Sequence, residues 1–119
     1  MVVDDDSDII FSVQEGFGCL DSNYEIVGAE NGRECIELLK NKKIPDAILL
    51  DVMMPEMTGW ELFDRLKENA SWRDIPIIFL TARTDRIAKN AGSFLGEDYV
   101  EKPFEIKNLK TRIDNILKT

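Results

Sequence analysis

Short apolar runs alternate with segments of helical periodicity along this 119-residue chain, and this alternation constrains the fold most strongly. The apolar runs predict five strands, which are Met1–Val3, Tyr24–Val27, Ala47–Leu50, Ile75–Leu80 and Tyr99–Val100. The third and fourth runs are continuously apolar, as strands covered on both faces require. Five strand–helix units in sequence predict an α/β fold in which a parallel sheet carries helices on both faces.

Apolar residues spaced three and four positions apart predict a helix after each strand. The expected starts are Ser7 or Asp8 as N-cap, Asn31 as N-cap, Gly59, Thr84 or Asp85, and Glu105, with the last helix ending near Lys118. The apolar helix faces, including Trp60 and Phe63, are interpreted as core. The first strand is short, so either the native chain extends before Met1 or the sheet accepts a stub there.

The acidic charge balance argues against nucleic acid as a partner. Lys and Arg number 15 and Asp and Glu number 23, which gives a formal net charge of −8. Binding to a phosphate backbone needs a basic surface, so no direct nucleic-acid binding is expected. No apolar run approaches the roughly 20 residues that cross a bilayer, and no signal peptide opens the chain. We therefore expect a cytoplasmic protein that does not associate with membranes.

The remaining composition predicts one domain without metal-binding thiols. No linker, repeat or low-complexity segment interrupts residues 1–119, so a single domain is expected. The chain has no histidine, which excludes a histidine base or zinc ligand. Cys19 and Cys35 form no CxxC motif, and both are expected to be reduced and mostly buried.

Polar side chains follow the predicted strands at the points where the strands end. These side chains are Asp4, Asp5, Asp6, Asp51, Thr81 and Lys102. The carboxyl ends of parallel strands share one edge of the sheet, so the side chains are expected to converge there. Acids after a strand are also typical of a helix N-terminus, where the helix dipole favours negative charge. Converging carboxylates repel one another unless a cation compensates, and oxygen ligands suit Mg²⁺.

At these residues the sequence resembles the receiver domains of bacterial and archaeal two-component response regulators. The matching segments are Val2–Asp6, Leu49–Gly59, Leu80–Ala82 and Tyr99–Phe104. The resemblance covers essentially the whole chain in the right order and spacing. It implies a flavodoxin-like doubly wound α/β fold with a five-stranded parallel sheet in the strand order 2-1-3-4-5.

The resemblance implies a phosphoacceptor and a metal site. Asp51 would accept a phosphoryl group, and Asp4, Asp5 and Asp51 would bind Mg²⁺ together with the backbone carbonyl of Met53. Asp5 would bind the metal directly and Asp4 partly through water. An apolar Met53 offers no base to an attacking water, so we expect modest autodephosphorylation.

The resemblance also implies residues that respond to the phosphoryl group. Thr81 would hydrogen-bond one phosphoryl oxygen, and Lys102 would pair with another. Tyr99 occupies the aromatic switch position, and a half-buried strand tyrosine without a switch role is the alternative interpretation. The bond between Lys102 and Pro103 is a candidate cis peptide, because family receivers commonly hold it so. Leu95–Gly96 departs from the family pattern, and the fourth helix is therefore expected to be frayed or shifted.

The function that the resemblance implies is a phosphorylation-activated switch of a two-component system or phosphorelay. A histidine kinase or phosphotransfer protein would be the donor, and a downstream effector protein or domain would read the face of the fourth helix, fifth strand and fifth helix. A homodimer through that face, and a chain that stands alone or belongs to a longer protein, stay open. The chain would not be a turnover enzyme in itself.

Two other functions stay open as alternatives. A haloacid dehalogenase-type phosphohydrolase or phosphotransferase would also use an aspartate nucleophile and Mg²⁺. That family places its nucleophile after the first strand with a second aspartate two residues on, whereas here Asp51 follows the third strand and position 53 is Met. A pseudo-receiver acting only as a binding module usually lacks one of the site residues. Binding of FMN has little support, because acids rather than a phosphate-binding loop follow the first strand.

Overall fold

The computed structural model describes residues 1–20, 24–52, 54, 56–82, 98–102 and 104–117. The strands are β1 (Val2–Val3), β2 (Gly28–Ala29), β3 (Ile48–Asp51), β4 (Ile77–Ala82) and β5 (Asp98–Lys102). The helices are α1 (Ser7–Leu20), α2 (Gly32–Lys40), α3 (Gly59–Glu68) and α5 (Ile106–Leu117). The helix expected after Thr84 or Asp85 falls outside the described residues.

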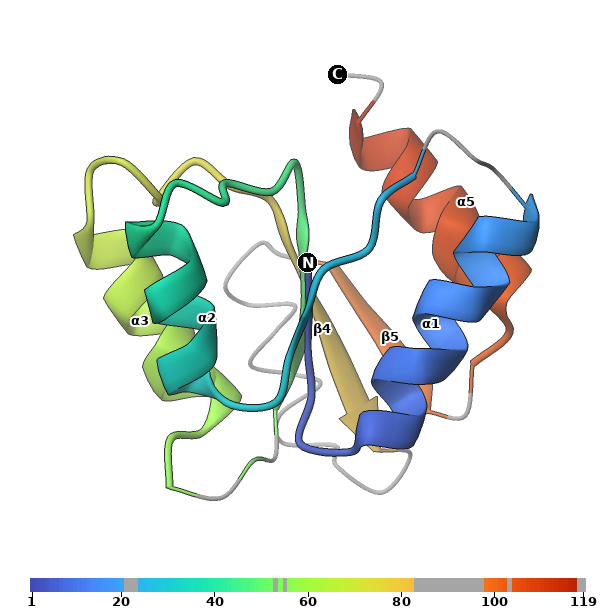
Figure 1. The fold of residues 1–119 in the computed structure, drawn as a ribbon, viewed down its shortest axis with the longest axis horizontal. Helices are drawn as coiled ribbons and strands as arrows, with labels where there is room; N and C mark the ends of the chain where they lie inside the picture. The colour runs from blue at the N-terminus through green and yellow to red at the C-terminus, as the bar shows by residue number, and fades with distance from the viewer. Residues whose placement is uncertain (21–23, 53, 55, 83–97, 103, 118–119) are drawn as a thin grey trace.

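The five strands form one parallel sheet in the order β2-β1-β3-β4-β5, which confirms the predicted flavodoxin-like fold. Helices α2 and α3 cover one face of the sheet, and α1 and α5 cover the other (Figure 1). The order in which strands are added to the sheet reverses at β1, because β2 lies on one side of that strand and β3 on the other. In open sheets of this kind, ligands bind beyond the carboxyl ends of the strands at such a point.

Two apolar cores lie on the two faces of the sheet. Val3, Leu50 and Phe79 pack with the helices α2 and α3, whereas Val2, Leu49 and Leu80 pack with α1 and α5. Neighbouring residues of a strand point to opposite faces, so the continuous apolar runs in β3 and β4 supply both cores.

The aromatic residues of α3 belong to the core on the α2–α3 face. Phe63 is buried, and its ring centroid lies 5.4 Å from that of Phe79. The Trp60 ring lies 4.6 Å from the same phenylalanine and is partly buried. These contacts confirm the interpretation of both residues as part of the core, with Trp60 at its margin.

The prediction of the second strand at Tyr24–Val27 was wrong, because β2 comprises only the two residues after it. The apolar side chains of the predicted segment are used elsewhere. The Tyr24 ring packs edge-on against Phe17 of α1 at a centroid distance of 5.3 Å, and Ile26 packs against the same core. Tyr24 and Ile26 therefore pack with α1 instead of forming a strand, and Val27 contributes only its carbonyl oxygen, which accepts the N–H of Val2 at 2.8 Å. Strand β1 comprises two residues, Val2 and Val3.

The start of α1 also differs from its prediction. Neither Ser7 nor Asp8 is the N-cap, because the side chain of Asp6 accepts the N–H of Asp8 at 2.9 Å. The carbonyl oxygen of Asp6 accepts the first helical bond, from Ile10. Carboxylates are favoured at this position because they pair with free N–H groups and the helix dipole. The third acid of the run therefore starts a helix.

The starts of α2 and α3 follow the predictions, and α5 begins at Ile106, one residue after the expected Glu105. Asn31 caps α2 by accepting the N–H of Glu34 at 2.9 Å, and α3 begins at Gly59 with Thr58 as its cap. The cysteines are both free, but only Cys35 is buried, so the prediction of a mostly buried Cys19 was wrong. Cys19 is the second-last residue of α1 and is exposed.

Candidate functional site

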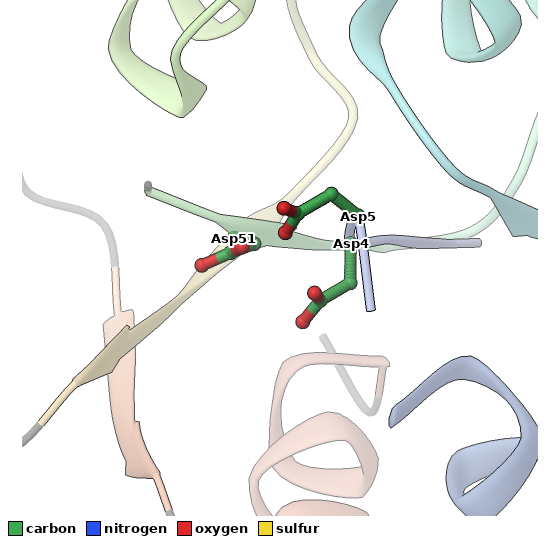
Figure 2. Close-up of side chains that lie close together, drawn as sticks. All are labelled: Asp4, Asp5 and Asp51. Atoms are coloured by element: carbon green, nitrogen blue, oxygen red, sulfur yellow. The ribbon is translucent and has the colours of Figure 1, made fainter. Parts of the chain in front are cut away.

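The ends of three strands bring charged side chains together at the carboxyl edge of the sheet. Asp4 directly follows β1, Asp51 is the last residue of β3, and Lys102 is the last residue of β5. Figure 2 shows Asp4 and Asp5 beside Asp51, on the end of the neighbouring strand. Asp4 and Asp51 are 0% and 5% exposed, whereas Asp5 is exposed. Two buried carboxylates in one place need compensating partners.

The backbone fixes Asp4 from both sides. Its N–H donates to the carbonyl oxygen of Ala29 at 3.1 Å, which extends the pairing of β1 with β2. Its Oδ1 accepts the N–H of Asp6 at 2.9 Å. The same Asp6 caps α1, so the start of this helix and the orientation of the Asp4 carboxylate are determined together.

Lys102 pairs with both buried carboxylates. Its Nζ lies 2.7 Å from Asp4 Oδ2 and 3.4 Å from Asp51 Oδ1. Burial alone would lower the pKa of the ammonium, but the hydrogen bond with Asp4 and the charges of Asp4 and Asp51 outweigh burial and raise the pKa. Lys102 therefore stays a cation at neutral pH, as expected for a residue that pairs with an anionic group.

The carboxylates suit a hard divalent cation. One oxygen each from Asp4, Asp5 and Asp51 lie within 4.8 Å of one another. All three donors are oxygens, and carboxylates of this kind are the protein ligands that Mg²⁺ prefers. Three carboxylates against the single ammonium of Lys102 leave negative charge at the site. A bound cation would neutralise that charge, so the residues present fit the metal expected from the sequence.

Of the remaining predicted site residues, Tyr99 is described in full and Thr81 by its backbone. Thr81 belongs to β4, where its backbone lies opposite Glu101 in the register with β5. The structure does not describe Met53, Pro103 or the side chain of Thr81. The metal contact of the Met53 carbonyl, the cis bond before Pro103 and the hydrogen bond from the Thr81 hydroxyl therefore stay predictions. Tyr99 is half-buried on β5 and packs against the α2–α3 core.

Gly59 has a role at the site that the sequence analysis did not assign. A β-carbon on this residue would lie 2.4 Å from the carbonyl oxygen of Asp51 and 2.8 Å from the Cα of Val52. Both contacts are with backbone, so any side chain would push α3 away from the end of β3. The N–H of Gly59 donates to the carbonyl of Val52 at 2.9 Å. The sequence offered one signal for this close approach, which is a glycine at the first position of a predicted helix.

Comparison with known proteins identifies the family. The model of the response regulator receiver domain matches residues 1–114. The chain therefore belongs to the receiver domains, which are the regulatory switches of two-component signalling. No helix in the described part of the chain is both long and apolar enough to cross a bilayer.

The relatives carry this domain in longer proteins. Histidine kinase P4 of Formosa agariphila is 41% identical over 99 residues, which are 82% of this chain and 7% of the kinase. Response regulator SaeR of Staphylococcus aureus is 37% identical over 118 residues, which are 98% of this chain and 49% of SaeR. The chain thus spans less than half of either relative.

A solved structure supports the same family. The signal receiver domain of a signal transduction histidine kinase from Syntrophus aciditrophicus is 29% identical to this chain, with a TM-score of 0.85. The match covers 98% of this chain and 87% of that structure. The likeness therefore extends over the whole fold and is not confined to the sheet.

Proposed function

We propose that residues 1–119 form a single receiver domain in which Asp51 accepts a phosphoryl group in a Mg²⁺-dependent reaction. The observation that carries this proposal is the meeting of three carboxylates and one ammonium at the ends of separate strands. Asp4, Asp5 and Asp51 would hold the metal, together with the carbonyl of Met53. The metal would supply positive charge that neutralises the site and the phosphoryl oxygens.

The chemistry is an attack by a carboxylate on phosphorus. An oxygen of Asp51 forms the new bond, and the bond from phosphorus to the donor nitrogen of a phosphohistidine breaks. The electron pair stays on the imidazole nitrogen of the donor, which can take up a proton. Lys102 lies 3.4 Å from Asp51 and would pair with a phosphoryl oxygen as charge is transferred. The hydroxyl of Thr81 would bond another oxygen.

The partners follow from this chemistry and from the family. The donor would be a histidine kinase or a phosphotransfer protein, and the signal would pass to an effector protein or domain. A groove of about 820 Å³ runs along β5 and α5 and is lined by Tyr99, Glu101, Phe104 and Arg112. The mixed apolar and charged lining of this groove suits a protein partner or a second copy of the chain. Movement of Thr81 toward the phosphoryl group and rotation of Tyr99 would remodel this surface.

The domain would act as a switch in the cytoplasm and not as a turnover enzyme. The signal would last as long as the acyl phosphate on Asp51, because hydrolysis of this group returns the domain to its unphosphorylated state. A phosphohydrolase of the dehalogenase type would instead release phosphate from many substrate molecules. The alternative of a pseudo-receiver has less support, since Asp4, Asp51 and Lys102 are present and Lys102 contacts both carboxylates.

Phosphorylation by a small donor tests the proposal. The protein is incubated with acetyl phosphate, with and without Mg²⁺, and its intact mass is measured. We expect one added phosphoryl group that needs Mg²⁺ and is removed by hydroxylamine, as an acyl phosphate is. Asp51→Asn should prevent the adduct, whereas Asp64→Asn, which alters an exposed acid on α3, should not.

The other outcomes separate the alternatives. An adduct on serine or threonine would refute the assignment of Asp51. Repeated turnover of small phosphate esters would favour the phosphohydrolase, and absence of any adduct in the wild type would favour the pseudo-receiver.

A further inference from the structure

We propose that Gly32 and Met57 form a brace that positions the acceptor loop, which joins β3 to α3 and of which the structure describes residues 52, 54 and 56–58. This inference rests on the function proposed for Asp51, because the loop begins directly after that residue. Neither member of the brace is one of the charged residues of the site. Gly32 would therefore be a positioning residue, acting through the loop.

Gly32 leaves open the space that Met57 occupies. It is the first residue of α2 and is buried. A β-carbon at position 32 would lie 2.4 Å from the sulfur of Met57 and 3.3 Å from its Cγ. Contacts between carbon and sulfur this short are strongly repulsive. A β-carbon at position 32 would therefore require the flexible thioether of Met57 to rotate away from α2 and its Cγ to shift by a few tenths of an ångström.

The backbone beside Met57 is held in an unfavourable conformation. Glu56 has a φ of 66°, in the left-handed region that residues with side chains rarely adopt. Such a conformation persists where surrounding contacts hold it. The Arg33–Glu56 ion pair spans 3.9 Å between exposed groups and contributes little. The seating of Met57 against the buried glycine is a contact that can contribute to holding this turn.

The brace acts on the acceptor side through the end of the loop. Two residues after Met57, the N–H of Gly59 closes the loop onto the carbonyl of Val52. The same glycine abuts the backbone of Asp51 without room for a β-carbon. A loop released from α2 would therefore loosen the backbone that carries the phosphoacceptor.

The brace acts on the metal side through β2. Gly32 follows β2 by only three residues, and Ala29 in that strand accepts the N–H of Asp4 at 3.1 Å. Asn31 fixes the start of α2 in between through its cap. The contact of Gly32 with Met57 thus connects the strand that supports Asp4 to the loop that follows Asp51.

Amide hydrogen exchange tests the brace without metal or phosphoryl donor. In Gly32→Ala, we expect the amide of Gly59 to exchange about tenfold faster than in the wild type, because the loop opens locally. Gly18→Ala is the matched control, since that glycine also lies in a helix but a β-carbon there would meet nothing within 4 Å. Unchanged exchange in Gly32→Ala, or an equal change in Gly18→Ala, would overturn the proposal.

A second substitution tests whether the contact itself is responsible. Met57→Ala should also speed exchange at Gly59, because it removes the thioether that fills the space beside Gly32. In the double variant the two β-carbons would lie about 3.5 Å apart, an ordinary packing distance, so the contact is partly restored. We expect exchange in Gly32→Ala/Met57→Ala to be slower than in either single variant. An effect equal to the product of the single effects would refute a direct contact.

The rate of phosphorylation by acetyl phosphate then connects the brace to the site. We expect each single variant to react several-fold more slowly than the wild type and the double variant to recover part of the loss, since misplacement of a reacting group lowers the rate. Exchange that responds while the phosphorylation rates stay equal would refute the positioning role. If the wild type takes up no phosphoryl group, the proposed function fails instead, and the exchange data still decide whether the brace exists.

Discussion

Asp4 has both of its carboxylate oxygens engaged in hydrogen bonds. One accepts the N–H of Asp6 and the other lies 2.7 Å from the ammonium of Lys102. A cation bound beside Asp4 would therefore meet the positive charge of Lys102 across a few ångströms. The lysine should weaken metal binding and yet assist phosphoryl transfer.

Replacing Lys102 should separate these two effects. In Lys102→Met, we expect Mg²⁺ to bind roughly threefold to tenfold more tightly, because a nearby like charge is removed. Phosphorylation by acetyl phosphate should become slower, because the transferred group loses a cationic partner. Isothermal titration calorimetry gives the affinity, and Lys110→Met is the control, since Lys110 pairs with Asp114 on α5. Weaker metal binding in Lys102→Met would contradict the interpretation.

The two cysteines should react very differently with thiol reagents. Burial raises the pKa of the Cys35 thiol to about 12, so its thiolate is scarcely populated near neutral pH. Cys19 is exposed. We expect Ellman's reagent to modify one thiol in the native protein and two in denaturant, with Cys19→Ser abolishing the native reaction. Rapid modification of Cys35 in native Cys19→Ser would show that the core around α2 opens readily.

At the scale of elements, the end of α2 contains a residue in a costly conformation. The N–H of Lys42 donates to Leu39 and that of Lys43 donates to Leu38, which is the Schellman pattern that ends many helices. Lys42 has a φ of 66°, where glycine is usual.

Glycine at this position should stabilise the fold. In Lys42→Gly, we expect the free energy of unfolding to rise by about 0.5–1 kcal/mol, because relief of the left-handed strain exceeds the added entropy of the unfolded chain. Chemical denaturation measures the change. The neighbouring Lys43→Gly lacks this strain and should not stabilise; an equal gain there would point to loss of a charge as the cause.

The elements also show what could be predicted from the sequence. Strands β3 and β4 were predictable because a continuous apolar run serves two cores at once. Tyr24–Val27 misled the prediction because apolar residues that pack on a helix look the same as strand residues. The cap of α1 was assigned one or two residues late, since several neighbouring acids could each accept the same N–H groups.

The candidate site was predictable in its members but not in its internal contacts. Parallel strand ends share an edge, so Asp4, Asp51 and Lys102 could be expected to meet. The closer pairing of Lys102 with Asp4 than with Asp51 depends on distances that spacing does not encode. The same holds for Gly59, whose role follows from a close approach between two backbones.

At the scale of the whole molecule, the acidic site should cost stability when no metal is bound. Asp5 adds a third carboxylate to a protein that already carries a net charge of −8. In Asp5→Asn, we expect the metal-free protein to unfold at a higher temperature, because repulsion at the site is reduced.

The same substitution should remove most of the stabilisation by Mg²⁺. A ligand at 100 times its dissociation constant stabilises the native state by about 2.7 kcal/mol, and weaker binding reduces this gain. Thermal unfolding with and without Mg²⁺ measures both effects, with Asp64→Asn as a control on the exposed surface of α3. If the unfolding temperature of the wild type does not change when Mg²⁺ is added, this result would argue against a metal site at these residues.

No single stretch of the sequence contains all the residues of the site. Its charges come from segments almost a hundred residues apart in sequence, and the ammonium arrives only with β5, the edge strand, through its pairing with β4. A molecule whose edge strand has not yet docked would retain the carboxylates without their lysine. Competence to receive a signal should therefore require that β5 is docked, so that copies without this strand in place stay silent.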